Sequence, residues 1–136
     1  MKKLLTLLVL IVTFASCSTQ TKQEKPEEKP LKDQVMDVHD EVMPKMGQLM
    51  KTKKALMAKA ETIAATDAAA AAELISLAEE IDLANEAMMD WMRNFDPNFT
   101  GTEEEVKAYL MKKKQGIDKV AESMSSRLEA GKKALE

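Results

Sequence analysis

Apolar residues recur every seven positions in the segment after Pro30, and this repeat is the most regular feature of the chain. One track of the repeat consists of Val35, Val42, Leu49, Leu56 and Ile63. The adjacent track consists of Met36, Met43, Met50, Met57 and Ala64, and a third consists of His39, Met46, Lys53 and Ala60. Three neighbouring tracks predict a long helix from about Leu31 to Ala64, with a wide apolar stripe that packs against two neighbouring helices.

Pro44 lies inside this segment, but the seven-residue repeat continues across it without a change of phase. Proline removes the backbone donor for the carbonyl of Asp40, four residues earlier, and bends a helix at that point. We therefore predict one continuous helix that is kinked at Pro44. The alternative is a helix that ends before Pro44 and another that restarts there, because proline is favoured at the first position of a helix.

A second helix is predicted from Thr66-Asp67, which can supply an N-cap, to about Asn94. Its seven-residue repeat consists of Leu74, Ile81, Met88 and Phe95, and the flanking apolar positions are Leu77, Ala84 and Trp91. Residues 95–101 contain Pro, Asn and Gly, which together predict a turn.

A third helix is predicted to begin after Thr102, because Thr102 with Glu105 three residues later is a capping-box pattern. Its apolar positions are Val106, Leu110, Ile117, Val120, Met124, Leu128 and Leu135. Short connections favour antiparallel neighbours, so residues 31–136 are predicted to form an all-α, up-down-up three-helix bundle with coiled-coil-like heptad packing. The alternative is a helical hairpin that completes its core by dimerising.

Composition agrees with a helical chain and narrows the classes of partner. The chain has 136 residues, of which 45% are hydrophobic and only 4 are glycine, and no segment alternates apolar and polar residues at strand spacing. The formal net charge is -3. Proteins that bind nucleic acid carry a basic surface toward the phosphates, so we expect no nucleic-acid partner.

The first sixteen residues have the pattern of a secretory signal peptide. Lys2 and Lys3 precede an apolar run from Leu4 to Phe14, which is too short to span a membrane as a helix. The string Phe14-Ala15-Ser16-Cys17 resembles a bacterial lipobox. This resemblance implies removal of residues 1–16 and attachment of lipid to Cys17, the only cysteine of the chain, with a membrane anchor as the result.

Cleavage before Cys17 would leave 120 residues and change the net charge from -3 to -5, since Lys2 and Lys3 are lost. Residues 17–30 have no apolar residue after the cysteine and are expected to form a disordered tether, about 20 Å long on average. Ser18 in place of an aspartate resembles lipoproteins that are sorted to the outer membrane. We therefore expect a cell-envelope location at the outer membrane.

The predicted hairpin brings two methionine-rich stretches to one end of the bundle. If the first two helices turn near Ala65-Thr66, Met43 lies opposite Met88, and His39 lies opposite Met92. If the next turn centres on residues 98–99, Tyr109 lies opposite Met88 or Met89.

One imidazole with two or three thioethers would suit Cu(I) or Ag(I), with Trp91 and Tyr109 as a shield from water. The alternative is packing, because the methionine track continues to Met50 and Met57, far from the histidine. Packing is the preferred interpretation of these residues, with no metal and no cofactor.

The stretches VHDEVMPKM, residues 38–46, and AMMDWM, residues 87–92, also carry a family resemblance. Together with the lipoprotein signal, they resemble small helical lipoproteins of Bacteroidota-type bacteria that are often labelled "viral A-type inclusion protein". The resemblance implies a helical fold and an envelope location, and it implies no chemistry.

No catalytic motif is visible in the sequence. His39 is the only histidine, no serine lies in a Gly-x-Ser-x-Gly elbow, and the four glycines form no phosphate loop. We therefore expect no enzyme. Three hypotheses remain: a lipid-anchored structural or interaction bundle, a periplasmic Cu(I)- or Ag(I)-binding protein, and a module that presents a helical methionine face to a partner, including a second copy of itself.

Overall fold

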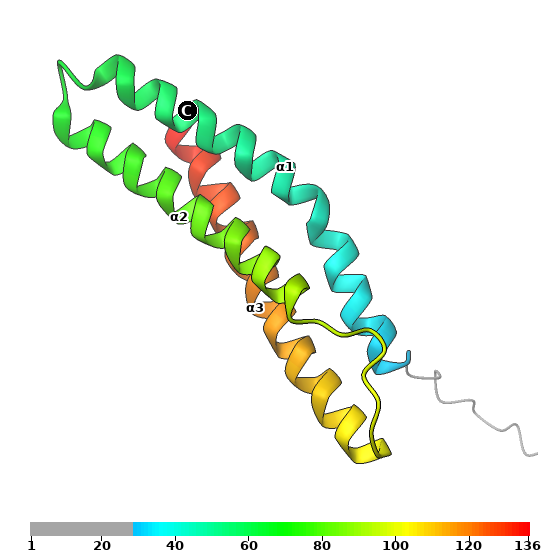
Figure 1. Ribbon diagram of the computed structural model, residues 1–136. Coiled ribbons are helices and arrows are strands. Elements are labelled where there is room, and N and C mark those ends of the chain that lie inside the picture. The colour runs from blue at the N-terminus through cyan, green and yellow to red at the C-terminus, as the bar shows by residue number, and fades with distance from the viewer. Residues whose placement is uncertain (1–28) are drawn as a thin grey trace, which may run out of the picture.

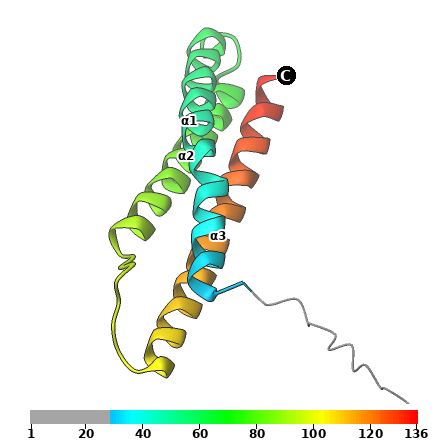
Figure 2. The same cartoon turned by 90° about the vertical axis from the view of Figure 1, so that its right-hand side faces the viewer.

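Three helices pack against one another in an up-down-up bundle (Figures 1 and 2). The computed structural model describes residues 29–136, and the expected signal peptide, Cys17 and most of the tether lie outside these residues. The helices are α1 (Leu31–Ile63), α2 (Ala68–Arg93) and α3 (Glu103–Leu135), and residues 29–136 contain no strand. The predicted fold class is confirmed.

Helix α1 runs through Pro44 without interruption. A helix that ended and restarted at Pro44 was the alternative, and it is wrong, because core packing on both sides of Pro44 keeps one helical phase. Val42 and Leu49, on either side of the proline, are both buried. Figure 1 shows the path of α1 bending in its cyan, N-terminal part.

Side chains cap the N-terminal ends of α2 and α3, as the sequence predicts. The carboxylate of Asp67 accepts a hydrogen bond from the backbone N–H of Ala70 at 2.9 Å, which caps the start of α2. At the start of α3, the hydroxyl of Thr102 accepts from the backbone N–H of Glu105, and the Glu105 carboxylate accepts from the backbone N–H of Thr102 at 2.8 Å. The hydrogen bonds from Thr102 lower the pKa of Glu105, because they favour its charged form.

The buried core follows the predicted repeats in all three helices. Its fully buried large side chains are Val35, Val42, Leu49, Leu56, Ile81, Met88, Ile117 and Met124. Of the third-helix positions, Ile117, Met124 and Leu128 are buried, whereas Val106, Leu110, Val120 and Leu135 are only partly buried. Both α2 and α3 contact α1 and each other, so the bundle closes around this single core.

Gly131 continues the heptad of Ile117 and Met124, and it is buried where all three helices meet. A Cβ atom at this position would lie 2.5 Å from Cγ2 of Thr52 in α1 and 3.2 Å from Cδ1 of Ile81 in α2. Thr52 is itself the buried polar residue of this region. Glycine therefore allows α3 to approach α1 more closely than any side chain would permit.

Within residues 29–136, no helix is both long enough and apolar enough to cross a membrane.

Candidate functional site

The predicted His/Met group lies where α1 and α2 approach the connection to α3. Met88 is fully buried in the core, and Met43 and Met92 are partly buried against it. His39 lies at the edge of the core with 19% of its side chain exposed. Met88 belongs to the core cluster, and the other two methionines pack against it.

One polar contact and one aromatic contact fix the ring of His39. Its Nδ1 lies 2.9 Å from Oδ1 of Asp40, and its ring stacks on Trp91 with centroids 5.9 Å apart. A carboxylate at Nδ1 favours the tautomer with the proton on that nitrogen and leaves a lone pair on Nε2. In this orientation Nε2 is the nitrogen that could hold a soft metal.

The His39 ring is the first member of a series of stacked rings that we call the aromatic column. Trp91 and Phe95 stack with centroids 4.8 Å apart, Phe95 and Tyr109 are 6.3 Å apart, and Tyr109 and Phe99 are 4.2 Å apart. The column contains every aromatic residue in the described part of the chain. It connects all three helices at this end of the bundle and packs down the α2–α3 connection.

The predicted position of Tyr109 opposite Met88 or Met89 is wrong. Tyr109 instead lies against Phe95 and Phe99, and its hydroxyl accepts a hydrogen bond from the backbone N–H of Asp96 at 2.6 Å. The reason is the length of the connection, which Figure 2 shows extending beyond the end of α2 before α3 begins. A turn centred on residues 98–99 gives the wrong register, because the extended path of the connection shifts α3 along α2 by about two helical turns.

Trp91 is held by a second constraint from α3. Its indole N–H donates to the backbone carbonyl of Lys113 at 3.0 Å. A Cβ atom at Gly116 would lie only 3.2 Å from the indole ring, so the glycine gives the ring its place beside α3. Lys113 closes the group by donating to the carbonyl of Asn94 and lying over the ring of Tyr109.

In residues 29–136, no three His, Cys, Asp or Glu side chains lie close enough together to hold a metal ion. A metal at this end of the bundle would therefore depend on methionine sulfur beside His39.

A second candidate site is an apolar surface along α1 and α2. Met50 and Met57 were predicted to lie in the packed stripe, but both are exposed. Their track lies at the outer edge of α1, beyond the residues that meet α2, and α3 packs on the other edge of the stripe. Only two helices cover α1, so this part of the methionine track is left at the surface.

Helix α2 contributes the other half of this surface. Met50, Leu83 and Met89 line one groove of about 500 Å³, and Met57 and Ile75 line another of about 470 Å³. Residues of α1 and α2 alone line both grooves. Leu83 is 71% exposed, the largest exposed fraction among the large apolar side chains of residues 29–136. We call this surface the α1–α2 face; its apolar residues are Met50, Met57, Ile75, Leu83 and Met89.

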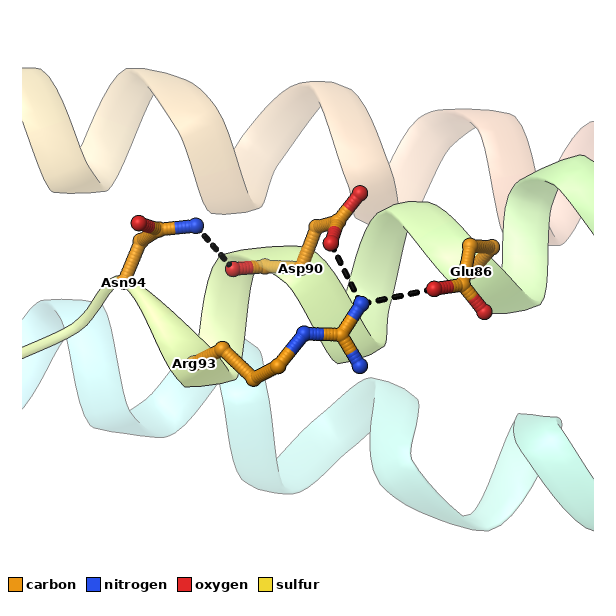
Figure 3. A network of polar contacts seen from close by, with 4 residues as sticks. All are labelled: Glu86, Asp90, Arg93 and Asn94. Carbon is orange, nitrogen blue, oxygen red and sulfur yellow. Dashed lines mark hydrogen bonds and ion pairs between the residues drawn. The ribbon is translucent and has the colours of Figure 1, made fainter.

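Acidic side chains follow the α2 edge of the face. Asp82 and Glu86 line the groove beside Leu83. Figure 3 shows Arg93 reaching back along α2 toward Glu86 and Asp90, and the Arg93–Glu86 distance is 2.6 Å. These hydrogen bonds raise the pKa of the Arg93 guanidinium, because they favour its charged form. One arginine pairs with two carboxylates, so this edge of the face keeps a net negative charge.

The α1–α2 face also contains a polar group with no partner. Asn85 lines the groove with Met50 and Met89, and its side-chain oxygen is buried with no hydrogen-bond donor among residues 29–136. A buried acceptor without a partner costs about 1–3 kcal/mol. Sequence reasoning missed this residue because an asparagine within a helix ordinarily lies in solvent.

No protein-family model, curated protein or solved structure matches this chain. The function must therefore be inferred from the chain's own residues.

Proposed function

We propose that this protein is a lipid-anchored helical bundle of the cell envelope that acts by binding another polypeptide through the α1–α2 face. One observation carries the interaction role. Five of the seven large apolar side chains that are exposed in residues 29–136 lie on this one face. Single exposed apolar residues are ordinary on protein surfaces, but a contiguous group across two helices is typical of an interaction site.

The anchor is supported by the Phe14-Ala15-Ser16-Cys17 string and by the polar segment that follows it. A lipid on Cys17 would hold the bundle near a membrane and leave all three helices in water. Mass spectrometry of the protein extracted from membranes should find an N-terminal Cys17 with acyl mass. A free Cys17 thiol, or a mature chain that begins elsewhere, would contradict the anchor.

A non-enzymatic role agrees with how the reactive side chains are used. The only histidine stacks on Trp91 and bonds to Asp40. The hydroxyl of Tyr109 accepts from the backbone of the α2–α3 connection. Both groups thus make contacts that hold the bundle together.

The interaction role is tested by a photoreactive amino acid placed at one position in producing cells. At Leu83 the probe should cross-link to a polypeptide, because that side chain would be buried in the complex. At Met111, an exposed apolar residue of α3, the same probe should give no cross-link to that polypeptide. Equal cross-linking at both positions, or none at Leu83, would contradict the proposed function.

A second candidate function is Cu(I) or Ag(I) binding, and the contact between Nδ1 of His39 and Asp40 favours it by leaving Nε2 as a ligand. Met43, Met88 and Met92 would supply sulfur. Titration of the reduced protein with Cu(I) against a chelator should then show one-to-one binding that is lost in His39→Ala and in Met43→Leu. Met57→Leu is the matched control, since Met57 lies in the same track, two heptads from Met43. If the protein does not compete with a micromolar chelator for Cu(I), these residues serve packing alone.

A further inference from the structure

The two helices of the α1–α2 face carry opposite charges. On α1, Lys53 and Lys54 lie on this side of the helix, whereas Lys45 and Lys59 donate to α3. On α2, Asp82 and Glu86 line the face, whereas Glu80 pairs with Arg127 of α3. A surface with one basic edge and one acidic edge is complementary to a rotated copy of itself.

Lys54 and Glu79 are two exposed charges on this surface, and Glu61 is a third at its Ala64 end. Lys54 lines the groove that Met57 and Ile75 share. Glu79 lies one heptad before Glu86, which lines the other groove, so the two acids share one side of α2. Both Lys54 and Glu79 are exposed, and neither forms an ion pair within residues 29–136.

We propose that a second copy of this chain occupies the α1–α2 face, related to the first by a two-fold axis that runs along the bundle. This inference rests on the proposed function and names its partner. In this arrangement, α1 of each copy lies against α2 of the other. The Lys53–Asp82 ion pair shows which residues of the two helices are level with each other, so Lys54 comes level with the partner's Glu79 and the partner's Asp82.

Charge also discriminates against the other symmetric arrangement. A two-fold axis across the bundle would place α1 against α1 and α2 against α2, so that the carboxylates of α2 would face each other. It would also direct the two chains' Leu31 ends in opposite directions. An axis along the bundle places both ends on the same side, as two chains anchored in one membrane through Cys17 require.

The size of the face fits a dimer of moderate affinity. The 26 residues of α2 extend over about 39 Å, and two helices about 10 Å apart present a surface about 20 Å wide. Contact over most of this surface would bury roughly 1,400 Å² in total, inside the range of specific interfaces. Tethering both chains to one membrane raises their effective concentration and favours association further.

The test is sedimentation equilibrium of the protein extracted from membranes into density-matched detergent. A monomer–dimer equilibrium is expected, and Leu83→Glu should raise the dissociation constant by more than about tenfold, since it puts a charge at the centre of the contact. Met111→Glu introduces the same charge at an exposed apolar position of α3 and should leave the equilibrium unchanged. Circular dichroism confirms that each variant remains helical.

The direction of the axis is tested by exchanging charges. Lys54→Glu and Glu79→Lys should each weaken the dimer by about tenfold, and the double variant should restore it to within about threefold. The arrangement would be overturned if Leu83→Glu left the dissociation constant of the dimer unchanged. It would also be overturned if the double variant dimerised more weakly than either single variant. A monomer at every concentration, with cross-links from position 83 to a different protein, would overturn the inference and leave the proposed function standing. Absence of any cross-link would overturn both.

Discussion

Replacing Gly131 with alanine tests whether close approach of α3 to α1 decides how this bundle packs. Alanine stabilises a helix interior relative to glycine by about 1 kcal/mol. At Gly131 the new Cβ would lie 2.5 Å from Cγ2 of Thr52, about 1 Å inside an ordinary carbon–carbon contact. Overpacking of this kind costs about 1–3 kcal/mol, so the net change should be a loss of up to about 2 kcal/mol.

Gly47 provides the matched control, because it lies within α1 and a Cβ there would meet nothing within 4 Å. Gly47→Ala should therefore raise the free energy of unfolding by about 0.5–1 kcal/mol. Urea denaturation followed by the fluorescence of Trp91, the only tryptophan, measures both changes.

Thr52→Ser isolates the clash, because it removes the Cγ2 methyl that the new Cβ would meet. In the Thr52→Ser background, Gly131→Ala should cost at least about 1 kcal/mol less than it does in the natural chain. Equal stability of the Gly131→Ala and Gly47→Ala variants would refute the reasoning. So would strict additivity of Gly131→Ala and Thr52→Ser.

Leu49→Ala should lower the free energy of unfolding by about 2–5 kcal/mol, because Leu49 is fully buried; a change below about 0.5 kcal/mol in urea denaturation would contradict its central position. Asn85→Leu should raise the unfolding free energy by about 1 kcal/mol, because it removes the unpaired buried oxygen; a lower thermal midpoint would show that this oxygen has a role. The pKa of Glu105 lies below its ordinary value. The stability that Glu105 contributes to the fold is therefore complete above the ordinary pKa and is lost as pH falls through the lowered pKa. Glu105→Gln should therefore flatten the acid side of the stability–pH curve, and an unchanged slope would contradict the cap.

Local patterns determine the helices of this protein and most of its core. The bounds of α1 and α2 agree with the predicted ones to within about two residues, and the capping box of Thr102 and Glu105 forms as expected. These features depend on interactions between residues close in sequence, such as a cap or a heptad face. Val42 and Leu49 are buried because any packing of this helix would bury that stripe.

The candidate sites depended more strongly on tertiary structure. The sequence placed His39 beside the AMMDWM stretch, and His39 does stack on Trp91. It did not predict the ring stack of Phe95, Tyr109 and Phe99, because that stack depends on how far the α2–α3 connection extends. The length of an irregular connection is decided by packing at both of its ends, and seven-residue periodicity carries no information about it.

The tertiary structure alone decided which apolar residues remain at the surface. Met43 and Met50 occupy the same track of one heptad repeat, yet Met43 packs against the core and Met50 is 45% exposed. In the sequence, Gly131 is a gap in the apolar repeat of α3, but in the structure it lies where α3 is too close to Thr52 of α1 for a side chain to fit. A repeat specifies the direction in which a side chain points along its own helix. The number and spacing of the neighbouring helices then determine whether anything covers it.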